Sequence, residues 1–154
     1  MEVSIIIICL ILSAFFSGME IAYISSNKVY LGIEKKQDNF LSKILSKLTE
    51  NPSKFIASML IGNNIALVVY GFFMGELIMK QLVFLELTSS IWVTHFIQIF
   101  ISAIVIIITA EFLPKIFFQI YANTLIKAMA IPAYVFYQLF YYVSSSIIWI
   151  SDII

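Results

Sequence analysis

The sequence of 154 residues contains few charges and no arginine. Only 12% of the residues are Asp, Glu, Lys or Arg, about half the share found in a soluble globular domain. All nine cations are lysines, the formal net charge is zero and the lysines form no basic tract, which argues against nucleic acid as a partner. With 62% hydrophobic residues and a mean hydropathy of +1.02, we predict an all-α protein whose main partner is the lipid bilayer.

The side chains on which most enzymes and transition-metal sites depend are also scarce. Cys9 is the single cysteine and lies in an apolar run, so an internal disulfide is impossible. His95 is the single histidine, and the sequence offers it no evident catalytic partner. No nucleophile–base pair, glycine-rich phosphate loop or Cys/His cluster is visible, so we expect no enzymatic activity.

Three stretches without Asp, Glu, Lys or Arg are long enough to cross a bilayer as helices. They comprise the 17 residues of Val3–Met19, the 21 residues of Phe55–Gly75 and the 24 residues of Leu87–Ala110. A helix rises about 1.5 Å per residue, so each stretch approaches or exceeds the thickness of the hydrocarbon core. We predict three membrane-crossing helices, at about residues 3–27, 52–79 and 91–113.

Residues 128–151 form a fourth uncharged stretch, which hydropathy alone would also place across the membrane. Pro132 interrupts this stretch early, and many aromatic residues of the kind that favour the membrane interface crowd it. The alternative is a helix that lies in the interface against the bundle. These residues alone leave both interpretations open.

Residues 28–54 are the one extended polar segment, with six lysines and three acidic residues. Apolar residues recur at helical spacing from Leu41 to Leu48, which predicts a short amphipathic helix at about 39–49. The excess of lysine places this segment in the cytoplasm and therefore the N-terminus outside. Asn51-Pro52 favours the start of the next helix.

The third stretch ends in a carboxylate, Glu111, followed by Pro114. An acid at membrane depth is costly unless another group pairs with it. Proline removes a backbone donor and disturbs the helix, and the carbonyls it frees can bind an ion if they line a cavity. Glu111 is therefore the first candidate for a functional side chain, and Pro114 marks a predicted helix break.

Other polar residues inside the apolar stretches are candidates to meet Glu111. Ser13, Ser17 and Glu20 share one face of the first helix by their spacing, and Asn63 and Asn64 lie inside the second stretch. Serines in membranes often bond to carbonyls of their own helix, and asparagines can hold helices together without any ligand. Glu20 could equally be an acid that faces lysine or cytoplasmic water.

Two glycine patterns indicate backbone features. Gly18 predicts a bend or break in the first helix, beside a face of small residues suited to close helix contact. Gly71 and Gly75 have the GxxxG spacing, which predicts a helix-packing face, either within the chain or between subunits.

Three segments together match a known pattern. They are LSAFFSGMEIAYIS, with a Ser-Gly-x-Glu core, NPSKFIASMLIGNN, with Asn-Pro and Gly-Asn elements, and AEFLPK. In this order they resemble the transmembrane domain of the CorC/cyclin M family over nearly the whole chain, AEFLPK being similar to the family's Gly-Glu-x-x-Pro-Lys. Ala110 stands where the family usually has glycine, and Met19 where a small residue is common.

The resemblance implies a homodimeric membrane domain with three crossing helices and a cytoplasmic-side juxtamembrane helix, here at about residues 124–151. It implies a plasma membrane location, the inner membrane in a bacterium, with the C-terminus in the cytoplasm. A cytosolic CBS-pair domain would then follow residue 154. A cytoplasmic C-terminus requires an odd number of crossings, which favours the interfacial interpretation of residues 128–151.

The resemblance also implies export of Mg²⁺ coupled to uptake of Na⁺. By the same resemblance, Ser13, Ser17, Asn63 and Glu111 would hold a dehydrated Mg²⁺. An oxygen-only set of this kind argues against zinc, copper or nickel, although not against other hard divalent ions. Further side-chain or backbone ligands would come from Gly18, Glu20, Gly62, Asn64 and Ala110. The alternatives are a Mg²⁺-sensing regulatory module and a structural membrane anchor without transport.

Overall fold

The structure is a computed structural model that describes residues 1–37, 39–84 and 90–153, the last three without their side chains. The described residues form helices and no strand. Three helical rods in these ranges are long and apolar enough to cross a membrane, namely Glu2–Ser25, Pro52–Phe84 and Ile91–Ile120. This confirms the predicted all-α membrane fold with three crossing helices.

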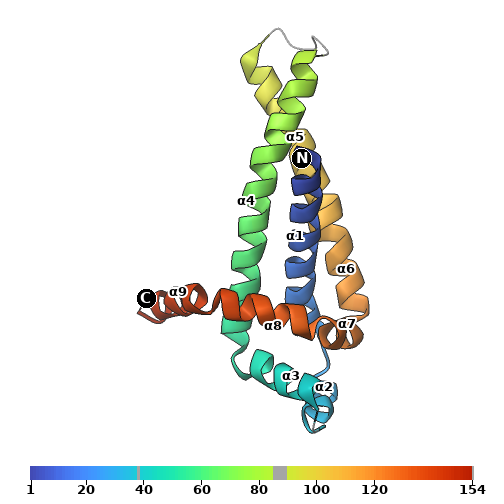
Figure 1. Ribbon diagram of the computed structural model, residues 1–154, viewed down its shortest axis with the longest axis vertical. Helices are drawn as coiled ribbons and strands as arrows, with labels where there is room; N and C mark the ends of the chain where they lie inside the picture. Colours follow the sequence, from blue (N-terminus) through green and yellow to red (C-terminus); the bar gives the residue numbers. More distant parts are fainter. Residues whose placement is uncertain (38, 85–89, 154) are drawn as a thin grey trace.

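Helices α1 (Glu2–Ser25) and α4 (Pro52–Phe84) run side by side and form the centre of the molecule (Figure 1). Phe16 of α1 is buried against α4 at Gly62, where an added Cβ would lie 2.6 Å from the phenylalanine ring. Glycine therefore allows the two backbones to approach closely, as is common between membrane helices. Farther along the pair, Ile6, Cys9 and Tyr70 form a second apolar cluster.

The third crossing rod consists of α5 (Ile91–Ile106), the π-helical segment η1 (Ile107–Phe112) and α6 (Leu113–Ile120). It packs on α1 mainly through η1 and α6. The rod continues seven residues beyond the predicted end at residue 113. Pro114 does not break it, because the proline lies in the first turn of α6, where a missing N–H is tolerated. The disturbance appears instead as the π-helical segment just before it.

Gly18 does not break α1 either, and this prediction was wrong. The helix runs unbroken from Glu2 to Ser25, and Gly18 is buried inside it. An added Cβ at Gly18 would lie 2.5 Å from the ring of Phe118 on α6. The glycine serves the close contact between α1 and the third rod, so the backbone has no need to bend there.

The polar segment between α1 and α4 forms two short helices, α2 (Lys28–Lys35) and α3 (Phe40–Glu50). The side chain of Asn27 caps α2, and that of Asn39 caps α3 by accepting from the backbone N–H of Ser42. The amphipathic helix expected at about 39–49 corresponds to α3, which buries Ile44, Leu45 and Leu48. Sequence periodicity did not indicate α2.

The single helix expected at about 124–151 is three helices, α7 (Ala122–Ala128), α8 (Ala130–Leu139) and α9 (Tyr141–Ile153). A continuous helix would bring the ring of Pro132 against the carbonyl of Ala128, four residues earlier, and the break at Met129 avoids this clash. Figure 1 shows α8 lying across the bundle near the end where α4 begins, and α9 continuing past α4 away from the other crossing helices. The hydroxyls of Ser58 on α4 and Ser144 on α9 lie 3.1 Å apart and help to fix this position.

Candidate functional site

Two buried hydrogen bonds, about one helical turn apart along α1, join three different elements inside the bundle. Ser13 on α1 donates to Oδ1 of Asn63 on α4 at 2.5 Å, and Ser17 on α1 donates to the carbonyl oxygen of Ala110 in η1 at 2.8 Å. None of these four residues is more than 8% exposed. Ser17 also lies near the carbonyl of Ala14 in its own helix, but at 3.4 Å. The bonds between helices are the shorter ones, so back-bonding is not the main role of the serines.

The Ala110 carbonyl is available because of the sequence that follows it. In an α-helix this carbonyl would accept from the residue four positions later, which is Pro114 and has no N–H. Just before the proline, the N–H of Leu113 reaches five residues back to the carbonyl of Ile108. Short π-helical segments of this kind occur often at functional sites. The proline thus leaves a carbonyl oxygen for Ser17.

Glu111 follows Ala110 but points to a different neighbourhood. Its side chain is 37% exposed, and its carboxylate lies 3.8 Å from Nζ of Lys115, one turn later. The charges of both Glu111 and Lys115 also act on Glu20 of α1. Among the described residues, no hydrogen bond joins the Glu111 carboxylate to Ser13, Ser17 or Asn63. The predicted ligands therefore divide into a cluster of neutral oxygens and two carboxylates, Glu20 and Glu111, which form an adjoining charged group with Lys115.

The remaining predicted site residues lie around the cluster in different ways. Asn63 faces inward, whereas Asn64 is exposed. Gly62 and Gly18 contact aromatic rings and are too crowded to hold a further group. Gly75 meets the side-chain amide of Gln98, which would lie 2.5 Å from an added Cβ, but Gly71 faces open space. Packing within the chain thus uses Gly75, and a contact of Gly71 with another subunit stays a prediction.

The contact between Lys115 and Glu111 was not predicted from the sequence, although their i,i+4 spacing could have indicated it. Within the described ranges, no three His, Cys, Asp or Glu side chains come close enough together to hold a metal ion. Any cation held in the bundle would therefore depend largely on neutral oxygens, which are the hydroxyl, amide and backbone groups of the cluster.

Comparison with known proteins identifies this architecture. The family model described as "Cyclin M transmembrane N-terminal domain" matches residues 4–154. The chain belongs to this family. The resemblance found in the sequence motifs is thereby confirmed, and the three apolar rods of this cyclin M domain make it an integral membrane protein.

A curated protein of Haemophilus influenzae (strain ATCC 51907 / DSM 11121 / KW20 / Rd), named "UPF0053 protein", is similar to part of this cyclin M domain. The two are 44% identical over 61 residues. The match covers 40% of this chain and 14% of the relative, so it concerns a small part of the longer protein.

Proposed function

We propose that this cyclin M domain carries Mg²⁺ out of the cytoplasm in exchange for Na⁺. In this proposal the ion passes through the oxygen cluster of Ser13, Ser17, Asn63 and Ala110, and Glu111 supplies negative charge. The observation that carries the proposal is the two buried hydrogen bonds, about one turn apart along α1, whose four oxygens come from α1, α4 and η1. Hard divalent cations take oxygen ligands of these kinds.

The spacing of the oxygens within each pair is compatible with Mg²⁺. Adjacent oxygens around an octahedral Mg²⁺, with Mg–O distances of about 2.0–2.1 Å, lie about 2.9 Å apart. The two bonded pairs in the cluster are 2.5 and 2.8 Å apart. Within each pair, Mg²⁺ therefore requires the oxygens to separate by at most a few tenths of an ångström.

Each bonded pair can change from a hydrogen bond to a pair of ligands. The amide oxygen of Asn63 and the carbonyl oxygen of Ala110 carry no proton and can present lone pairs directly to the ion. The hydroxyl protons of Ser13 and Ser17 need only rotate away for their oxygens to do the same. The ion then satisfies the four oxygens, and each hydroxyl proton needs a new acceptor; for Ser17 the carbonyl of Ala14, 3.4 Å from the hydroxyl oxygen, can serve.

Glu111 would balance the charge of the ion. Its 3.8 Å separation from Lys115 is longer than a close charge-assisted hydrogen bond, and pairs this exposed contribute little. Turning the carboxylate toward the cluster therefore costs little, and Glu20 is near enough to attract the lysine in its place. Four cluster oxygens, one carboxylate oxygen and one retained water complete six positions around Mg²⁺, which gives up its water reluctantly.

Na⁺ would return through the same cluster. It also binds hydroxyl, amide and carbonyl oxygens, and a single charge would allow Glu111 to stay with Lys115. The exchange would then consist of one site in two states, with Glu111 turned inward for Mg²⁺ and outward for Na⁺. This step as proposed involves neither the predicted homodimer nor the predicted cytosolic CBS-pair domain.

The test is Na⁺-driven Mg²⁺ flux in proteoliposomes, compared between wild type and Glu111→Gln. Glu76→Gln is the matched control, because Glu76 is also half-exposed and paired with a lysine one turn later, Lys80, but lies at the other end of the bundle. We expect the Glu111 variant to lose flux and the control to retain it. Mg²⁺ binding without any flux would favour the sensing module, and neither binding nor flux would favour the structural anchor.

A further inference from the structure

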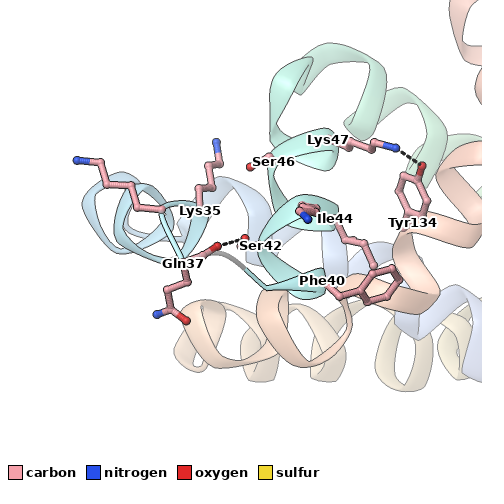
Figure 2. A pocket seen from close by; sticks show the side chains of 10 residues that line it. Lys35, Gln37, Phe40, Ser42, Ile44, Ser46, Lys47 and Tyr134 are labelled. Carbon is pink, nitrogen blue, oxygen red and sulfur yellow. Dashed lines mark hydrogen bonds between the residues drawn. The ribbon is translucent and has the colours of Figure 1, made fainter.

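A cavity of about 590 Å³ lies between the two polar helices α2 and α3 and the transverse helix α8. Figure 2 shows this cavity, with Lys47 of α3 reaching toward the hydroxyl of Tyr134 on α8. The cavity lies at the end of the bundle where α1 leads into α2, and the oxygen cluster is elsewhere, inside the bundle. Its volume falls in the range of small-molecule sites, about 300–1,000 Å³. This basic pocket plays no part in the transport proposal.

The charged side chains among the described lining residues of the basic pocket are all lysines. Four lysines line it, Lys35, Lys36, Lys43 and Lys47, and its described lining residues include no acidic side chain. Asp38 lies outside the described residues.

The nearest described acid along the chain, Glu34, is engaged elsewhere. Its carboxylate lies 2.8 Å from Nζ of Lys127 on α7. This ion pair and a hydrogen bond from Tyr30 hold the pKa of Glu34 below its usual value, although burial acts in the opposite direction. Glu34 therefore stays ionised and paired with Lys127, and it does not neutralise the lysines of the basic pocket.

One wall of the basic pocket belongs to a helix with an exposed apolar stripe. On α8, Ile131, Val135 and Leu139 follow one another at four-residue spacing and are 50–66% exposed. The opposite face of α8, including Ala133, is buried against the bundle. An exposed apolar stripe on a helix that lies across a membrane protein is typical of a helix at the membrane interface. Tyr134 lies next to this stripe, so the pocket opens at the level of the lipid headgroups.

Tyr134 is held in a fixed orientation at the pocket wall. Its hydroxyl oxygen accepts from Nζ of Lys47 at 3.3 Å and from Nε2 of Gln138 at 2.7 Å. The Lys47 ammonium has two further protons, which remain to bind a ligand. Phe40 also lines the pocket, is 71% exposed and offers an apolar surface. The basic pocket thus combines positioned ammonium groups with apolar surface.

We propose that the basic pocket binds the phosphate group of an anionic phospholipid from the membrane leaflet on this side. Lysine ammonium groups bind phosphate as point charges, and clusters of lysine beside a membrane attract anionic headgroups. A free phosphate would meet the same lysines but would leave Phe40 exposed to water. The glycerol and the first acyl carbons of a lipid would cover Phe40 and continue along the stripe of α8.

The test is titration of the purified protein with dioctanoyl phosphatidylglycerol, with bound lipid counted by native mass spectrometry. The pocket variant is Lys36→Gln/Lys47→Gln, which removes one ammonium from each polar helix. The matched control is Lys28→Gln/Lys54→Gln, which removes the same charge from the same end of the molecule but outside the pocket. We expect the pocket variant to bind about tenfold more weakly than the control. Phe40→Ala should also weaken lipid binding.

Three outcomes would overturn the proposal. Equal losses in the pocket and control variants would mean general attraction of lipid to a basic surface. Equal affinity for the neutral dioctanoyl phosphatidylcholine would remove the role of the headgroup charge. Binding of glycerol 3-phosphate as tight as that of the lipid, and unaffected by Phe40→Ala, would show that the occupant is a soluble phosphate. Circular dichroism and thermal unfolding of each variant verify that it is folded.

Discussion

The α1–α4 pair and the third crossing rod are built differently, although all three are apolar helices of membrane-spanning length. In the most apolar 18-residue window of each, 44% of α1 and 39% of α4 is buried, but only 11% of the third rod is buried. The pair is held by a buried aromatic contact at Gly62, whereas the third rod is attached mainly around η1 and α6. We call the α1–α4 pair the frame, and the third rod has the smaller buried share of the two.

This difference bears directly on the oxygen cluster. Ser13, Ser17 and Asn63 belong to the frame, and Ala110 belongs to the third rod. A small shift of the rod against the frame would open the cluster at the Ser17–Ala110 bond and leave the Ser13–Asn63 bond in place. Conformational changes of transporters commonly consist of one rigid part moving against another around a fixed site.

The largest effect should come from crowding the frame. We expect Gly62→Ala to destabilise the protein by about 2–3 kcal/mol, because the added Cβ collides with the ring of Phe16, which other aromatic rings hold in place. Gly71→Ala, where the new Cβ meets nothing, should instead stabilise by up to about 1 kcal/mol through helix propensity. Unfolding in mixed micelles, followed by helicity, measures both. Equal changes in stability for the two variants would contradict the claim that α1 and α4 are tightly packed at Gly62.

A smaller loss is expected from cutting the link between frame and rod. Ser17→Ala should cost about 1–2 kcal/mol, because it leaves the buried carbonyl of Ala110 without its donor. Ser146→Ala is the matched control, since Ser146 is exposed and bonds only to a carbonyl of its own helix. The same unfolding assay applies, and an unchanged stability in Ser17→Ala would mean that the carbonyl has another partner.

An added Cβ at the contact between α1 and the third rod should destabilise the protein less than one at the contact between α1 and α4. Gly18→Ala places a Cβ 2.5 Å from the ring of Phe118, as close as the contact at Gly62. We nevertheless expect a cost below about 1 kcal/mol, because Phe118 is only partly buried and its ring can move outward. A cost equal to that of Gly62→Ala would show that the third rod is as firmly packed as the frame.

The smallest effect concerns the ion pair between Glu34 and Lys127, which ties α2 to α7 at the end of the third rod. Lys127 lowers the pKa of Glu34 in the folded state, so the pair stabilises the protein above the unfolded pKa of glutamate. That contribution is lost as the pH falls through the folded pKa. Wild type should therefore be slightly more stable than Glu34→Gln at pH 7 and equal to it in acid. If wild type stayed more stable than Glu34→Gln in acid, Glu34 would act through its packing and not through its charge.

The crossing helices could be predicted from the sequence because apolar length is a local property. The neighbours of the polar side chains could not, since they depend on how three helices turn toward one another. Spacing placed Ser13 and Ser17 on one face, but it could not show that Ser13 meets Asn63 or that Glu111 turns toward Lys115. Pro114 indicated a disturbed backbone, and only the structure shows that this is a π-helical segment that leaves the Ala110 carbonyl for Ser17.

The basic pocket could not be predicted from the sequence for a related reason. Its lysines come from α2 and α3, and its aromatic wall comes from α8, more than eighty residues later in the chain. Hydropathy also could not distinguish a fourth crossing from transverse helices at residues 128–151. The helix breaks at Met129 because the ring of Pro132 would clash with a carbonyl one turn earlier. The position of this break follows from the three-dimensional backbone and not from hydropathy.

The measurement that tests the central claim most directly is Mg²⁺ binding by calorimetry to wild type, Asn63→Ala and Asn64→Ala. The two variants delete the same amide from adjacent positions, one inside the oxygen cluster and one exposed. We predict that Asn63→Ala binds Mg²⁺ at least about tenfold more weakly than wild type and that Asn64→Ala binds as wild type does. Equal affinities of all three folded proteins would contradict the claim that the cluster is the ion site.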